Sequence, residues 1–198
     1  MKLKYSILAI LTVLVFLFMP VAKSQAQSKF GIRGGLNVSN ISFDNLPDRG
    51  ERFGFHAGIF ADLPILPDFI HLQPELSYSL KGVAFKFLGD RETLNMKYID
   101  FLLPVAFRLG SIDLQVGPFA SYLISKPDYK VFDNTEVIVD AFKKTDVGLT
   151  AGLSYNFAPV TIGIRYNQGM VDISNDKGRP FLGSGKTAVG QVSLGFKF

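Results

Sequence analysis

The chain has 198 residues, of which 47% are hydrophobic, and it carries a formal net charge of only +4. It contains no cysteine, which excludes disulfides, thiolate metal sites, a cysteine nucleophile and lipid attachment at a cysteine. The small net charge, without a long basic run, argues against nucleic-acid binding.

The N-terminus has the pattern of a secretory signal peptide. Two lysines precede an apolar stretch at residues 7–19, which is short for a membrane-spanning helix. Small residues near the end of this region predict cleavage after Ala26, which divides the chain into a signal peptide at 1–26 and a mature domain at 27–198. The alternative is an uncleaved membrane anchor. The mature sequence has no run of 18 apolar residues.

The mature sequence alternates between apolar and polar residues in about eight successive segments. Strict alternation is typical of β-strands that have one apolar and one polar face. In the fourth segment the phase changes near Tyr98 and Ile99, which predicts a β-bulge there. The eight predicted strands cover residues 30–38, 52–63, 69–81, 94–109, 112–124, 145–157, 160–169 and 187–198.

The predicted links alternate between short and long. Short turns on one rim and longer loops on the other are typical of outer-membrane barrels. The pattern therefore predicts an all-β, eight-stranded antiparallel up-and-down transmembrane β-barrel, with both termini on the short-turn, periplasmic side. The short links are 64–68, 110–111 and 158–159, and the long links are 39–51, 82–93, 125–144 and 170–186.

The composition of the two faces favours a membrane barrel over a soluble, lipocalin-like one. The apolar face carries aromatic residues on nearly every strand, as a lipid-contacting surface with interfacial girdles requires. The terminal Phe198 lies on this face and is expected to act as the signal for the outer-membrane assembly machinery. The predicted girdle consists of Tyr78, Tyr98, Tyr122, Tyr155, Phe157 and Tyr166.

The polar face then lines the barrel interior, where charged side chains must pair with one another. A structural network of ion pairs is the simplest interpretation, and a narrow polar channel or a small-ligand pocket is the functional alternative. The predicted interior charge network consists of Arg33, Arg52, His56, Asp62, His71, Glu75, Arg108, Asp113, Asp146 and Arg165.

The two histidines raise the question of a metal site. If the second and third strands pair symmetrically about residues 65–66, His56 lies near Glu75 and His71 lies near Phe60. This predicts a hydrogen bond between His56 and Glu75. A metal site formed by the two histidines and Glu75 is an alternative that we do not favour, so neither a metal nor a cofactor is expected.

The sequence gives little support for an enzyme. A lipid-modifying hydrolase would need serine and histidine on the outer face, whereas both histidines fall on the inner face and no G-x-S-x-G motif is present. The long loops are instead the candidate contact surface. In the third loop, residues 137–139 are expected to extend a strand beyond the membrane, and the polar run 175–179 predicts a flexible fourth loop. Asp44, Asp48 and Glu51 in the first loop are at most a weak cation site.

Several segments resemble the porin-family outer-membrane β-barrel domain of the PorT type, over essentially the whole mature chain. The resemblance implies an eight-stranded outer-membrane barrel and little about activity. Asp100 stands where that family would carry glutamate. The matching segments are FGIRGGLN at 30–37, LQPELSY at 72–78, YIDFLLPV at 98–105, GPFASY at 117–122, DVGLTAG at 146–152 and RYNQG at 165–169.

Together these observations predict a monomer in the bacterial outer membrane with a structural, adhesive or accessory role. Its expected partners are outer-membrane lipid, the assembly machinery and an extracellular ligand at the loops. A passive pore for small solutes and an accessory factor of secretion or assembly are the alternatives.

Overall fold

A computed structural model describes residues 28–43, 49–87, 90–125, 128–131, 135–138, 142–175 and 183–198, so the expected signal peptide at 1–26 lies outside the described residues. Within these ranges no helix is long and apolar enough to cross a membrane. The strands are β1 (Lys29–Phe43), β2 (Arg49–Gly50), β3 (Arg52–Leu66), β4 (Ile70–Leu72), β5 (Glu75–Phe87), β6 (Asp90–Leu102), β7 (Val105–Leu109), β8 (Ile112–Leu123), β9 (Asp128–Val131), β10 (Thr135–Ile138), β11 (Thr145–Phe157), β12 (Val160–Gly169) and β13 (Gly185–Lys197).

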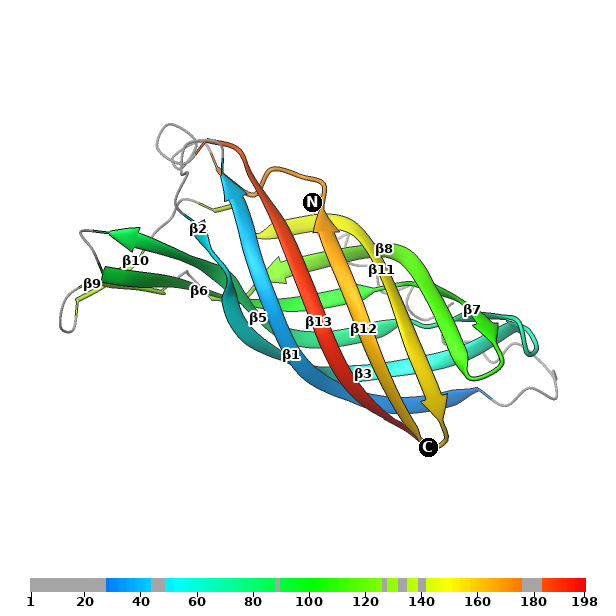
Figure 1. Cartoon of the computed structure of the whole chain (residues 1–198). Coiled ribbons are helices and arrows are strands. Elements are labelled where there is room, and N and C mark those ends of the chain that lie inside the picture. Colours follow the sequence, from blue (N-terminus) through cyan, green and yellow to red (C-terminus); the bar gives the residue numbers. More distant parts are fainter. Residues whose placement is uncertain are drawn as a thin grey trace, which may run out of the picture.

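These strands form a closed antiparallel barrel (Figure 1). Two strands of the wall have a short interruption: β4 and β5 together form one wall strand, and β6 and β7 form another. The ring therefore contains eight strands. The ring closes where β1 pairs with β13, from Gly31 opposite Lys197 to Phe43 opposite Gly185. The N–H of Phe198 also donates to the carbonyl of Phe30, at 2.8 Å. The predicted eight-stranded barrel is confirmed.

The two rims differ as the link lengths predicted. Three tight turns lie at one end, after β3, β7 and β11, and both ends of the barrel sequence lie there as well. At the opposite end the strands run further than expected, because the predicted second loop at 82–93 is mostly strand in β5 and β6. The hairpin of β9 and β10 pairs with β6 and continues this wall beyond the ring (Figure 1). Residues 137 and 138 of the predicted strand extension belong to β10, and residue 139 lies outside the described residues.

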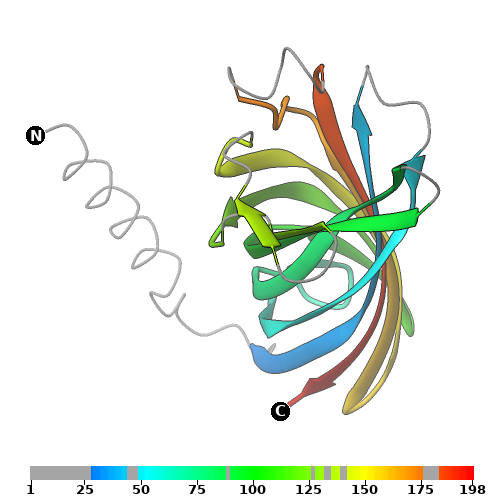
Figure 2. The same ribbon diagram turned by 90° about the vertical axis from the view of Figure 1, so that its left-hand side faces the viewer.

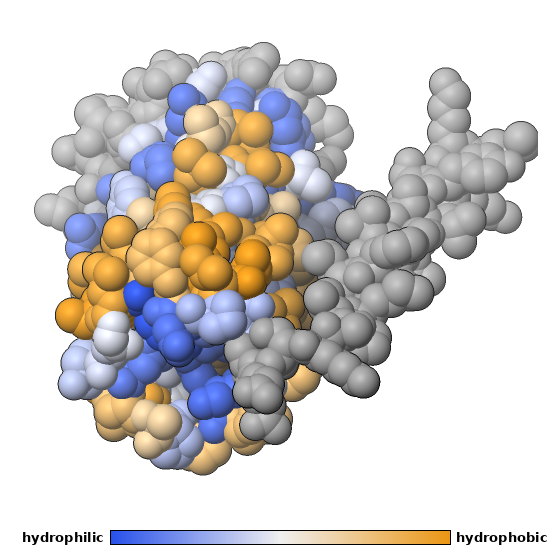
Figure 3. Space-filling model, turned by 90° about the vertical axis from the view of Figure 1, so that its right-hand side faces the viewer, coloured by the Kyte–Doolittle hydropathy of each residue, from blue (hydrophilic) through white to orange (hydrophobic). Residues whose placement is uncertain are grey.

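The apolar face of the wall points outward. Leu36 and Phe53 are 66% and 69% exposed, whereas Asn37, which follows Leu36 on β1 and lies opposite Gly54, is completely buried. Such a surface matches a lipid environment rather than water. Figure 3 views the end of the barrel with the short turns and shows hydrophilic side chains between hydrophobic patches of the wall. Of the predicted girdle, Tyr122, Tyr155, Phe157 and Tyr166 are exposed and Tyr78 is half-buried.

The predicted bulge at Tyr98 and Ile99 is wrong, and so is the outward position of Tyr98. β5 and β6 pair without a register shift from Glu75 opposite Leu102 to Phe87 opposite Asp90. Tyr98 is only 1% exposed and faces the interior. The apparent change of phase arises because the apolar residues of this strand lie on its inner face at the loop end, as Met96 and Tyr98 do, and on its outer face nearer the short turns, as Ile99 and Phe101 do.

The pairing of β3 with β4 and β5 also differs from the expected register. The chain turns at residues 67–69, two residues later than a turn centred on 65–66. Asp68 occupies a left-handed backbone conformation, with φ of 64°, which aspartate tolerates better than most residues. As a result, His56 lies opposite Ser79 and Glu75 lies opposite Phe60.

Candidate functional site

The polar face of every wall strand points into the barrel, and it brings the ten predicted network residues inside. Eight of them are buried, and Arg52 and Arg108 are half-buried. They do not form one cluster. Eight of them are distributed over three levels, which we call the turn-end cluster, the central cluster and the loop-end cluster. Of the other two, Arg52 donates to the backbone carbonyl of Phe53 at 2.9 Å, and His56 pairs with Asn37.

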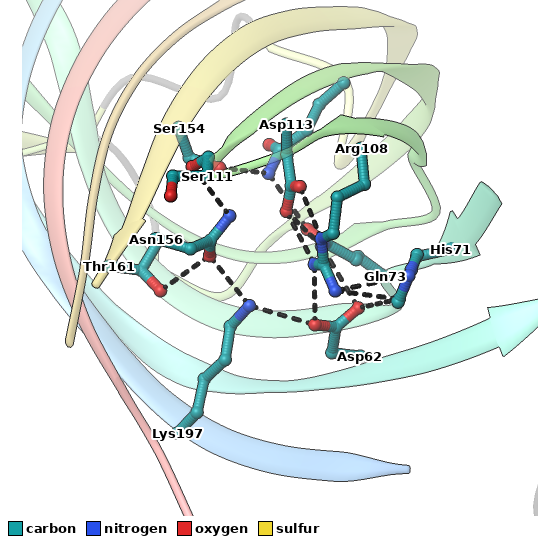
Figure 4. A network of polar contacts seen from close by, with 11 residues as sticks. Asp62, His71, Gln73, Arg108, Ser111, Asp113, Ser154, Asn156, Thr161 and Lys197 are labelled. Carbon is teal, nitrogen blue, oxygen red and sulfur yellow. Dashed lines mark hydrogen bonds and ion pairs between the residues drawn. The ribbon is translucent and has the colours of Figure 1, made fainter. Parts of the chain in front are cut away.

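The turn-end cluster is built around Asp62 and Asp113 (Figure 4). Arg108 on β7 donates two hydrogen bonds to Asp113, both at 2.8 Å, and a third to Asp62 at 2.9 Å. Asp62 also accepts from Lys197 at 2.9 Å and pairs with Nδ1 of His71 at 2.8 Å. The cluster therefore joins β3, β4, β7, β8 and β13 across the barrel.

Uncharged side chains extend this cluster toward β11 and β12. Lys197 donates to Asn156 Oδ1 at 2.8 Å, and the hydroxyl of Thr161 donates to the same oxygen at 3.1 Å. Gln73 donates to Asp62 and Asp113, at 3.3 and 3.2 Å. Gln73 thus supplies further donors to the two carboxylates, as a buried ionic cluster requires.

The central cluster consists of Glu75 between two arginines. Oε2 of Glu75 accepts from Arg33 on β1 and from Arg165 on β12, the latter at 3.1 and 3.0 Å. The guanidinium of Arg33 also lies 4.4 Å from the centre of the Phe60 ring, a favourable cation–π contact. Gly31 makes room for this ring, because a Cβ at residue 31 would come within 2.6 Å of it.

Gln115 connects the central and turn-end clusters. Its side-chain oxygen accepts from Arg165 at 3.3 Å, and its amide donates to Gln73 at 2.9 Å and to Ser154 at 3.1 Å. Because Gln73 itself contacts both aspartates of the turn-end cluster, one continuous chain of polar contacts crosses the barrel from Glu75 to the short-turn rim.

His56 does not bond to Glu75, and this prediction is wrong because of the register described above. Nδ1 of His56 pairs with Oδ1 of Asn37 at 2.7 Å, and Gln191 donates to the same oxygen at 3.0 Å. His71 likewise lies beside Asp62 rather than Phe60, since Pro64 stands opposite it. The metal site considered for the two histidines and Glu75 is therefore not formed.

More generally, no group of three potential metal-ligating side chains occurs in the described part of the chain. Asp44 and Asp48, considered above as a weak cation site, lie outside the described residues.

The loop-end cluster contains two carboxylates and one ammonium. Lys81 donates to Asp100 at 2.8 Å and to Ser121 at 3.0 Å, and it lies over the rings of Tyr98 and Phe119. Asp146 accepts instead from the hydroxyl of Thr187, and its Oδ1 has no hydrogen-bond partner. The predicted network did not include Lys81 or Asp100, although the alternation of the sequence placed Lys81 on the inner face.

Above this cluster the interior becomes apolar, a feature that the sequence interpretation missed. Inward-facing apolar residues of five wall strands are joined by two residues from the segments beside β11 and β12, where Phe142 bridges Ser174. Figure 2 looks at this end of the barrel. The apolar layer consists of Ile41, Val83, Met96, Leu123, Phe142, Ile173 and Val189, each at most 7% exposed.

The comparison with family models identifies the chain. Residues 24–175, well over half of the chain, match the family described as "Outer membrane protein beta-barrel domain". The chain belongs to this family. It is therefore a protein of the bacterial outer membrane, as the sequence predicted. No curated protein matches the chain significantly.

Solved structures of other outer-membrane barrels share this fold with the new family member. Neisserial surface protein A (NspA) is 13% identical with a TM-score of 0.60, and the alignment covers 87% of this chain and 99% of NspA. Ail, the attachment invasion locus protein of Yersinia pestis, is 15% identical with a TM-score of 0.52 and the same coverage. At these identities the likeness concerns the fold alone.

Proposed function

We propose that this protein is a non-conducting outer-membrane barrel that holds its loop-end strands in the extracellular space as a contact surface. The observation that carries the proposal is the filled interior. Polar contacts run continuously from Glu75 to the short-turn rim, and the apolar layer lies across the loop end. An eight-stranded barrel encloses a space that side chains roughly fill, so these residues argue against an open pore for solutes.

A contact role is supported by the strands beyond the ring. β5 and β6 continue past the wall, and β9 and β10 add a hairpin to them (Figure 1). β10 stands at the end of the strand order, so one backbone edge of this short strand has no strand neighbour within the described residues. Exposed strand edges can pair with an extended segment of another protein. One structural relative, Ail, was solved in complex with the heparin analogue sucrose octasulfate, so a barrel of this kind can bind an extracellular ligand.

Site-directed epitope labelling tests the orientation on which this role depends. An epitope inserted between β9 and β10 is expected to be labelled on intact cells, because long loops face outward in outer-membrane barrels. The matched control places the epitope in the turn between Gly110 and Ser111, where labelling should require permeabilised cells. The reverse pattern would overturn the proposal.

Export through a cleaved signal peptide, assembly through Phe198 and the PorT-type assignment remain predictions. Phe198 is exposed and its N–H donates to the carbonyl of Phe30 near the start of β1, so its ring is accessible to a recognition factor. If the PorT-type resemblance extends to a role in secretion, deletion of the gene should reduce the amount of other exported proteins.

A further inference from the structure

A row of basic side chains lies on the outer face of the barrel at the loop end. Lys97 on β6 is half-buried, and its neighbours Met96 and Tyr98 face the interior, so alternation directs Lys97 outward. Lys143 is exposed and in phase with the exposed residues Thr145 and Val147 of β11. Both lysines therefore lie on the side of the wall that contacts lipid.

The strand register places these two lysines at the same height, on either side of β8. The N–H of Ile124 donates to the carbonyl of Lys97 at 2.9 Å, and the N–H of Leu123 donates to the carbonyl of Lys144 at 2.7 Å. Lys97 and Lys143 thus flank Ile124. Since neighbouring strands lie about 4.8 Å apart, their backbones are about 10 Å apart. Two flexible side chains at this spacing can reach one phosphate group together.

Below this row the wall is apolar and aromatic. Tyr122 is opposite both Ile99 and Thr145, one step closer to the membrane centre than the lysines. Tyr122, Ile124 and Val147 are about half exposed. A surface with cationic groups above an apolar and aromatic wall complements an amphiphile with an anionic headgroup above its acyl chains.

The contacts of Lys143 fit this arrangement. Its Nζ donates to the backbone carbonyl of Asp172 at 2.9 Å, which leaves two of its three N–H groups for a ligand. The Oδ1 atom of the Asp172 carboxylate accepts from the N–H groups of Ser174 and Gly185, both at 2.9 Å. Lys143 is thus held by the neutral backbone carbonyl of Asp172, while Oδ1 of the Asp172 carboxylate is occupied by two backbone N–H groups.

We infer that this outer surface of β6, β8 and β11 binds a phosphate group of lipid A, the phosphorylated glycolipid of the outer leaflet, through Lys97 and Lys143. The acyl chains then lie against Tyr122, Ile124 and Val147. The inference uses the orientation proposed above, in which the loop end faces the outer leaflet. The binding itself can be measured without that orientation.

Native mass spectrometry of the refolded full chain with diphosphoryl lipid A tests the inference. Wild type should retain lipid A, and the double variant Lys97→Gln, Lys143→Gln should retain roughly tenfold less. The matched control is Lys186→Gln, which removes a single exposed lysine from the outer face of β13, where it pairs with Ser42, and should bind like wild type. Dephosphorylated lipid A and phosphatidylglycerol should both bind weakly.

Several results would overturn the inference. These are unchanged lipid A binding by the double variant, an equal loss in the Lys186→Gln control, and retention of phosphatidylglycerol as strong as that of lipid A. If the double variant fails to refold, the two single variants decide, and each should lose part of the binding. Because this assay uses isolated protein, the absence of lipid A binding would not affect the proposed orientation, which the epitope labelling tests separately.

Discussion

Glu75 on β5 and Arg165 on β12 meet inside the barrel, where Oε2 of Glu75 accepts two hydrogen bonds from the Arg165 guanidinium at 3.1 and 3.0 Å. Arg33 on β1 reaches the same oxygen. Three wall strands that are not neighbours in the sheet order, β1, β5 and β12, are thus tied together through one carboxylate.

Glu75→Gln should strongly destabilise the barrel. The substitution leaves two buried guanidinium groups without their carboxylate, and breaking a buried pair in this way costs about 3–5 kcal/mol. The free energy of unfolding can be measured by urea titration in lipid vesicles. Asp68→Asn removes a carboxylate from an exposed turn and should change it by less than about 0.5 kcal/mol. Equal effects of the two substitutions would contradict the role of Glu75.

The two carboxylates of the loop-end cluster should respond differently to the same change. Asp100→Asn deprives buried Lys81 of its carboxylate partner, whereas Asp146→Asn affects a group that accepts a hydrogen bond from the neutral hydroxyl of Thr187. We expect Asp100→Asn to lower the free energy of unfolding by at least about 1 kcal/mol more than Asp146→Asn. A larger loss for Asp146→Asn would show that the pairing is assigned incorrectly.

The outward face can be tested by placing a charge at different depths. Leu149 is half exposed in the middle of β11, and Thr145 is exposed at the loop end of the same strand. Leu149→Arg should cost about 2–4 kcal/mol in a bilayer, and Thr145→Arg about 0–1 kcal/mol. The same vesicle unfolding measurement compares them, and a similar cost at both positions would argue against a lipid-facing wall.

Alternation was sufficient to predict the barrel and the inner face, because a period of two assigns each residue of a strand to one side. The boundaries of β11 and β12 agree with the predicted segments at every residue. Prolines interrupt the third and fourth wall strands, where Pro74 and Pro104 lack an N–H for the ladder.

The pairs inside the barrel could not be predicted in the same way. A turn at Asp68, two residues later than the symmetric position, moves the partners of β3 on β5 by four residues. His56 therefore lies opposite Ser79 rather than Glu75, and it bonds to Asn37. The apolar layer was also missed, because the inner face of β6 becomes apolar at the loop end, and the resulting shift of apolar residues from one face to the other imitates a change of phase. Registers and long-range contacts depend on turn geometry and ring closure, which a period of two does not specify.

Single-channel recording on the folded, full-length barrel in planar bilayers shows whether the interior of the barrel is closed to ions. A sixteen-stranded porin in the same bilayers serves as the positive control, since it encloses an aqueous channel. We expect a silent membrane at protein amounts that give one or more inserted barrels. Reproducible unitary conductance steps from the wild-type protein would instead show that the interior is an open pore.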